Sequence, residues 1–210
     1  RKSATMTQRW RLVNGEELYD ILADPGQRSD VAAEHPDVVA ELRTHYEKWW
    51  DLVSTTFDEP CPIVIGSEEE ETPVITGHDW HGDQCPWNQG LIRQGVECNG
   101  YWVIEAAEAC EYVFELRRWP REEDRAITEG IEGEITDWYH GGNALDLQTA
   151  RIRIGDRVQQ APIPPGAKGV EFTFALDAGV TRMQTYLEGP EGLSIGAYYV
   201  YVEKRLANSD

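Results

Sequence analysis

Short strand-like runs, separated by glycine- and proline-containing turns, recur through the second half of the chain. Residues 151–154 and 170–174 alternate apolar with polar side chains, which is the two-residue period of a strand with one buried face. The last run, 196–202, is apolar on both faces and is predicted to be central in its sheet. Further runs occupy 101–105, 112–116 and 181–186. Without a helix-length periodic segment between them, these runs indicate an antiparallel β-sandwich of the jelly-roll kind.

A hairpin and one long helix are predicted near the N-terminus. Residues 10–13 and 17–21 are strand-like, and the Asn-Gly pair at 14–15 tolerates the positive φ angles of a tight turn. Pro36 suits the first position of a helix that should run to about Val53. Its apolar residues form one stripe at helical spacing: Val38, Val39, Leu42, Tyr46, Trp49, Trp50 and Val53. A hairpin plus one helix buries too little apolar surface alone, so we expect the stripe to pack on other protein.

These patterns predict an α+β protein that is mostly β. Residues 1–58 are expected to form the hairpin-plus-helix subdomain, and residues 59–77 a linker with short strands. Residues 78–210 should form the antiparallel, jelly-roll-like β-sandwich. The four consecutive acids at 68–71 are interpreted as a solvated loop.

The chain is strongly acidic, with 38 Asp and Glu against 19 Lys and Arg and a formal net charge of -19. This charge argues against a nucleic-acid partner, because phosphate binding needs a basic surface. No stretch approaches the roughly 20 apolar residues that cross a bilayer, so no membrane partner is predicted. We expect the protein to be periplasmic or secreted.

The four cysteines are too widely spaced for a Cys-x-x-Cys metal site. In an extracytoplasmic protein an even number permits two disulfides, with three alternative pairings. Our first choice is Cys85 with Cys98, which leaves Cys61 with Cys110.

Residues 77–93 concentrate polar and aromatic side chains between glycines, as binding loops on a rigid scaffold do. The alternative is that the Trp rings fill the edge of a core and the His side chains cap strand ends. The candidate substrate-binding residues here are His78, Asp79, Trp80, His81, Trp87, Asn88 and Arg93. No metal site is predicted, because His78 and His81 lie outside a helix and need not share one face.

Residues 117–121 contain three arginines and one tryptophan in an otherwise acidic chain. Arg118 and Trp119 are further candidates, since arginine clamps sulfate or carboxylate and an indole stacks on a sugar ring. The alternative is that the acids at 122–124 neutralise the cluster. The aromatic loop 137–143 has the same two interpretations.

The N-terminal region also carries a family resemblance. Glu-Leu-Tyr-Asp at 17–20, Asp-Pro-Gly at 24–26 and Tyr-x-x-Trp-Trp at 46–50 resemble the C-terminal subdomain of formylglycine-dependent, arylsulfatase-like sulfatases. Segments 78–80 and 116–120 are similar to a C-terminal extension in some bacterial members.

The resemblance implies that the chain is the C-terminal part of a sulfuric ester hydrolase, supplying support and substrate-specificity contacts. The Cys/Ser-x-Pro-x-Arg motif that yields formylglycine is absent, so no catalytic residue is predicted and the chain alone should be inactive. Formylglycine and Ca²⁺ are expected in a missing catalytic domain. That domain and a sulfated small molecule or glycan are the expected partners. The alternatives are a free-standing carbohydrate-binding β-sandwich module and a purely structural extension.

Overall fold

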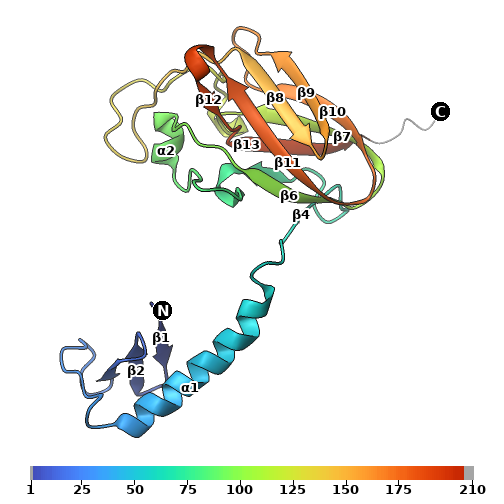
Figure 1. Cartoon of the computed structure of the whole chain (residues 1–210). Coiled ribbons are helices and arrows are strands. Elements are labelled where there is room, and N and C mark those ends of the chain that lie inside the picture. The colour runs from blue at the N-terminus through green and yellow to red at the C-terminus, as the bar shows by residue number, and fades with distance from the viewer. Residues whose placement is uncertain (1, 206–210) are drawn as a thin grey trace. The chain divides into compact units, whose positions relative to one another are not determined.

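The computed structural model describes residues 2–205 and divides into two compact units, Arg1–Pro60 and Cys61–Asp210 (Figure 1). Each unit is described by itself. The protein is α+β and mostly β, with one long helix and antiparallel sheets, which confirms the predicted fold class. Within residues 2–205, no helix combines the length and apolar character that crossing a bilayer requires.

The first unit is a three-stranded antiparallel sheet with one long helix. The sheet has the order β1-β2-β3, and its strands are β1 (Ala4–Met6), β2 (Trp10–Val13) and β3 (Glu17–Asp20). The predicted hairpin joins β2 to β3, where Asn14 and Gly15 have φ angles of 54° and 74°. Helix α1 spans Pro36–Val53, as predicted, and continues into the 3₁₀ turn η1 (Ser54–Thr56).

The apolar core of the first unit is small. Leu12, Leu18 and Leu42 are its buried members, with Val38 and Val39 packed against them. The predicted helix stripe is therefore covered by the sheet mainly in its N-terminal half. Trp49 of the stripe is exposed, as are Leu52 at the end of α1 and Phe57 just after η1.

The second unit is a sandwich of two sheets. The first has the order β10-β7-β13-β5, from β5 (Val74–Thr76), β7 (Cys110–Arg117), β10 (Val170–Leu176) and β13 (Tyr199–Arg205). The second has the order β4-β6-β11-β8-β9, from β4 (Ile63–Ile65), β6 (Tyr101–Ala106), β8 (Thr149–Ile154), β9 (Arg157–Pro162) and β11 (Gly179–Glu188), with β12 (Ser194–Ile195) beside β11. Every pairing is antiparallel except β4 with β6.

The predicted alternation of apolar and polar residues along the strands matches the alternation of buried and more exposed side chains in the sandwich. In β10, Phe172 and Phe174 are buried while Glu171 is exposed, and in β8 Ile152 and Ile154 are buried. These side chains belong to one apolar cluster that draws on both sheets. Strand β13 is central, because it pairs with β7 on one side and β5 on the other.

The segment predicted as a linker contributes strands to both sheets. Strand β4 pairs with β6, and β5 pairs with β13. Ile65 and Ile75 are fully buried in the sandwich core. The reason is apolar burial: each short strand supplies an isoleucine that leaves water only within the sandwich. The second unit therefore includes residues that the sequence assigned to 59–77.

All four cysteines are free thiols in this structure, so the predicted disulfides are absent. For Cys61 and Cys110 the strand register supplies the reason. Ile65, the last residue of β4, pairs with Ala106, the last residue of β6. Cys61 precedes the start of β4, whereas Cys110 follows the end of β6, so the two lie toward opposite ends of this parallel pair.

Candidate functional site

A groove of about 190 Å³ lies at the edge of the sandwich where β5 ends and β13 begins. Three chain segments form its walls: Thr76 to His78, Pro86 to Ile92, and the pair Tyr198 and Tyr199. Pairing of Thr76 with Tyr199 brings the first and third segments together. The absence of a side chain at Gly77 lets the second segment pack closely, because a Cβ on Gly77 would lie only 2.9 Å from Cγ of Pro86.

An exposed pair of indole rings accompanies this groove. Trp87, in the groove wall, is 59% exposed, and Trp138, from the loop between β7 and β8, is 51% exposed. Their rings meet edge to face, with centroids 5.9 Å apart and an interplanar angle of 83°. Large apolar rings held in water at a groove are typical of a contact surface for a ligand.

Polar groups line the same groove. Gln89 Nε2 donates a hydrogen bond to the hydroxyl oxygen of Tyr199 at 2.9 Å. Burial raises the pKa of Tyr199, so its hydroxyl is neutral at physiological pH. The hydroxyl proton has no acceptor among residues 2–205 and remains available to a ligand. His78 is exposed, with Nδ1 3.7 Å from Oδ1 of Asp79.

The short helix α2 (Gln89–Gln94) carries part of the groove wall. Asn88 is its N-cap, and the Asn88 side-chain oxygen accepts a hydrogen bond from the Leu91 N–H at 3.0 Å. The helix ends at Gly95, whose φ of 69° favours glycine. Asn88 therefore lines the groove but uses its oxygen to start the helix that follows Trp87.

Arg93, a predicted ligand contact, instead joins α2 to the loop that carries Trp138. Its Nη1 donates to the carbonyl oxygen of Gly141 at 3.0 Å, and its own carbonyl oxygen accepts from the Asn143 N–H at 2.8 Å. Figure 1 shows this loop, between β7 and β8, beside α2. Arg93 is thus a positioning residue for the two indole rings.

Arg118 holds the same loop from inside the protein. It is fully buried, and it donates to the carbonyl oxygens of Asn143 at 2.6 Å and Glu129 at 3.3 Å. Burial lowers the pKa of Arg118 to about 10, which still leaves the guanidinium charged at neutral pH. Trp119 is also buried, and its Nε1 donates to the Glu129 carbonyl oxygen at 3.0 Å. Neither predicted contact residue is accessible to a ligand.

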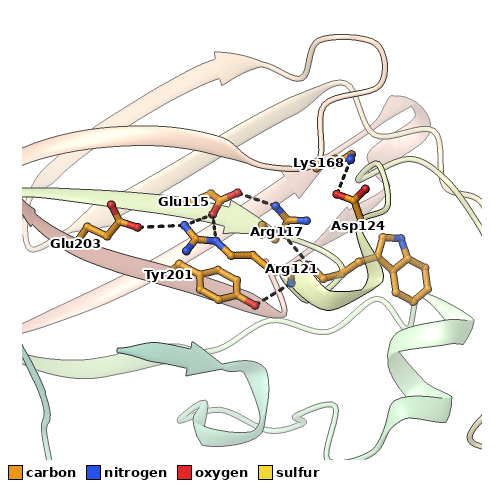
Figure 2. Close-up of polar contacts among 8 residues, drawn as sticks. Glu115, Arg117, Arg121, Asp124, Lys168, Tyr201 and Glu203 are labelled. Carbon is orange, nitrogen blue, oxygen red and sulfur yellow. Dashed lines mark hydrogen bonds and ion pairs between the residues drawn. The ribbon is translucent and has the colours of Figure 1, made fainter. Parts of the chain in front are cut away.

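The neighbouring arginines are neutralised by carboxylates. Figure 2 shows Glu115 between Arg117 and Arg121, with both nitrogen–oxygen distances at 2.7 Å. Arg121 also contacts Glu203 at 3.2 Å, while Asp124 pairs with Lys168. The predicted anion clamp at 117–121 is therefore replaced by ion pairs, most of which use carboxylates from strands rather than from 122–124.

Trp80 is a core residue. It is 7% exposed and packs against Trp102 and Tyr198, with ring centroids 5.5 and 6.0 Å away. Glycines make room for it: a Cβ on Gly196 would lie 2.4 Å from the indole, and one on Gly100 would lie 2.6 Å from the Trp80 Cβ. The alternative interpretation of this tryptophan, as a filler of the core, is the one that the structure supports.

The predicted residues therefore separate into groups. His78, Trp87 and Asn88 line the groove. Asp79 is exposed beside His78, and His81 stacks on Tyr101 with ring centroids 5.3 Å apart. Arg93, Arg118, Trp80 and Trp119 act in support or in the core, as described above. Across residues 2–205, no group of three or more His, Cys, Asp or Glu side chains is arranged to hold a metal ion.

The candidate residues did not include Thr76, Gln89 or Tyr199, and Trp138 was considered only as part of the aromatic loop 137–143. Trp138 belongs to the aromatic loop 137–143, whose composition was the available signal. Tyr199 lies in a run of aromatic and β-branched residues that reads as core, so nothing in its local sequence marks it as a groove residue.

Comparison with known proteins adds little to this geometry. No protein-family model matches the chain, and no curated protein does. Solved structures that are similar to part of it include an enzyme, a receptor and a binding module. A ruminal GH26 endo-β-1,4-mannanase is 13% identical with a TM-score of 0.39, and the match covers 67% of this chain and 27% of the mannanase chain. The plant receptor-like kinase ANX2 is 12% identical with a TM-score of 0.31, and the match covers 65% of this chain and 31% of the ANX2 chain. A family 35 carbohydrate-binding module from Clostridium thermocellum is 15% identical with a TM-score of 0.30, and the match covers 63% of this chain and 88% of the module.

The chain thus spans less than a third of the length of the mannanase and of the receptor-like kinase. TM-scores this low assign no function, and the description of the fold rests on the strand pairing given above.

Proposed function

We propose that the second unit is a carbohydrate-binding β-sandwich module in which a sugar ring stacks on Trp87. The observation that carries this proposal is the exposed Trp87–Trp138 pair beside a groove lined with hydrogen-bonding groups. One face of a pyranose ring presents C–H groups that pack on an indole, while its rim of hydroxyls needs polar partners. The groove supplies both kinds of contact.

The groove dimensions suit one sugar ring. Its volume of about 190 Å³ is below the roughly 300–1,000 Å³ of pockets that enclose drug-sized ligands. One ring would fill it, and the rest of an oligosaccharide would lie outside. The Tyr199 hydroxyl can donate to a sugar oxygen, and His78 and Thr76 border the same space. We assign no catalytic residue to this groove.

Glycan binding by the full chain tests the proposal. We would screen soluble polysaccharides by affinity gel electrophoresis and measure the strongest by isothermal titration calorimetry. Trp87→Ala should abolish measurable binding, since stacking on an aromatic ring is the main apolar contact. The matched control is Trp49→Ala, which removes an indole of similar exposure, 50%, from the first unit. Absence of binding to any glycan, or equal loss in both variants, would refute the proposal.

As a second candidate, we propose that the chain is the C-terminal part of a larger, sulfatase-like hydrolase. The first unit supports this candidate, because its buried apolar core is only Leu12, Leu18 and Leu42 while Trp49 and Phe57 are exposed. A unit with so little core is stabilised by packing on further protein. Reading the coding sequence upstream of Arg1 tests it. A Cys/Ser-x-Pro-x-Arg motif there supports the hydrolase candidate, and an unrelated upstream sequence rejects it.

A further inference from the structure

We propose that the groove selects neutral or positively charged sugars and rejects sulfated or carboxylated ones. This inference rests on the proposed glycan binding and adds the class of ligand. It departs from the sulfated ligand expected from the sequence, and it follows from where the basic and acidic side chains lie.

Arginine and lysine are absent from the groove lining in the described part of the chain. The arginines that a sulfate would use are already engaged. Arg93 has a side chain only 11% exposed and bonds a backbone carbonyl, and Arg118 is fully buried among carbonyls. Arg121 is exposed but contacts two carboxylates, Glu115 and Glu203. A sulfate in the groove would therefore gain no bidentate partner.

Carboxylates, in contrast, lie beside segments that form the groove walls. Burial is the main cause of the raised pKa of Tyr199, and the negative charges of Glu122 and Glu123 raise that pKa further. Glu123 lies near Arg93 and Arg125, at 4.0 and 3.8 Å, which offsets part of its charge. Glu122 is exposed and has no ion-pair partner among residues 2–205.

Two more carboxylates lie beside the groove residues. Asp79 is within 3.7 Å of His78 Nδ1, so the one imidazole in the lining already has an anionic neighbour. Asp137 immediately precedes the exposed Trp138 and bonds His140. His78 and His140 are thus each matched with an aspartate.

The energetic consequence depends on distance and salt. Charges within the Debye length, about 8 Å at physiological ionic strength, interact without full screening. An anionic sugar on Trp87 would be repelled by Glu122, which has no ion-pair partner across the residues that the structure describes, and would lose hydration without gaining a cationic partner. An ammonium-bearing sugar would instead be attracted, and a neutral sugar would be unaffected.

A set of hexasaccharides with one backbone tests this inference. Chitin hexasaccharide is neutral, chitosan hexasaccharide carries amines, and a 6-O-sulfated chitin hexasaccharide is anionic. A glycan array that presents other backbones in neutral, amine-bearing and sulfated or uronic forms extends the comparison. On every backbone that binds, the full chain should bind the amine-bearing form at least as tightly as the neutral form, and the sulfated or uronic form most weakly.

Preference for the sulfated or uronic form would overturn the ligand class and leave the proposed glycan binding intact. No binding to any form would overturn both. The variant Glu122→Gln tests the contribution of the Glu122 charge. It should weaken binding of the amine-bearing form about two- to threefold at low salt. Affinity for the neutral form should not change. The control Glu16→Gln removes one exposed carboxylate from the first unit and should change neither affinity. Equal effects of the two variants would also overturn the inference.

Discussion

Arg93 donates a side-chain hydrogen bond to the carbonyl oxygen of Gly141 at 3.0 Å, and this bond ties the helix after Trp87 to the loop that carries Trp138. The backbone bond from Asn143 to Arg93, at 2.8 Å, strengthens the same connection. Two exposed rings from distant parts of the sequence therefore keep a fixed spacing, because the mostly buried guanidinium of Arg93 links the segments that carry them.

Removing this guanidinium should loosen the paired rings. Arg93→Ala is expected to weaken glycan binding about tenfold and to destabilise the second unit by about 1.5–3 kcal/mol, as for a charged hydrogen bond. Hydrogen exchange should rise in residues 137–143. If affinity falls with no change in exchange there, Arg93 contacts the ligand directly and is not a positioning residue.

Arg118 should prove essential for stability and not for ligand contact. Arg118→Met leaves the Asn143 carbonyl oxygen without its donor and removes one of the two donors to the Glu129 carbonyl oxygen, so it is expected to cost about 3 kcal/mol in urea unfolding. Arg121→Ala is the matched variant: the Arg121 side chain is itself partly exposed to water, and Glu115 keeps Arg117 as a partner, so the loss should be less than about 1 kcal/mol. Equal stability of the two variants would contradict the assigned role of Arg118.

Acid should disorder the Trp138 loop. The Tyr139 backbone N–H, and then the His140 side chain, hold the pKa of Asp137 below its ordinary value of 3.8. A lowered carboxyl pKa contributes stability that is full above 3.8 and is lost as the pH falls through the lower, folded value. The protection factors for hydrogen exchange in the loop, which correct for the intrinsic rate at each pH, should fall over that acidic range. The Asp137→Asn variant should show faster exchange in the loop already at pH 7. If neither acid nor the substitution changes protection of the loop, the stabilising role of the Asp137 carboxylate is refuted.

Thiol reactivity should follow burial. Burial raises the pKa of Cys98 to about 11, so little thiolate forms at pH 8, whereas Cys61 is exposed. Iodoacetamide should label Cys61 first and Cys98 last in the folded protein, as followed by peptide mass spectrometry. If Cys98 were labelled as fast as Cys61, or if Cys61 were protected, the buried position of Cys98 and the exposed position of Cys61 would be contradicted.

Periodicity predicted the fold where neighbouring residues decide the structure. The alternating run at 170–174 became β10, and the stripe beginning at Pro36 became α1. Segment 59–77 was harder, because the pairing that makes Ile65 and Ile75 core residues comes from strands far along the chain.

The candidate site was less predictable for the same reason. Trp80 and Trp87 lie in one loop, yet Trp80 is buried because Gly100 and Gly196, from other segments, leave space for its ring. Arg118 looked like an anion clamp, since the sequence does not reveal which distant carbonyl oxygens, here Asn143 and Glu129, will surround a charged side chain.

Sugar binding at the groove is tested most directly by the indole N–H region of a ¹H–¹⁵N spectrum of the full chain, recorded while the best-binding glycan is added. Shifts are expected at Trp87 and Trp138, with the signals of the buried Trp80, Trp102 and Trp119 unmoved. Shifts confined to other tryptophans, or no shift at saturating glycan, would contradict a sugar-binding surface at this groove.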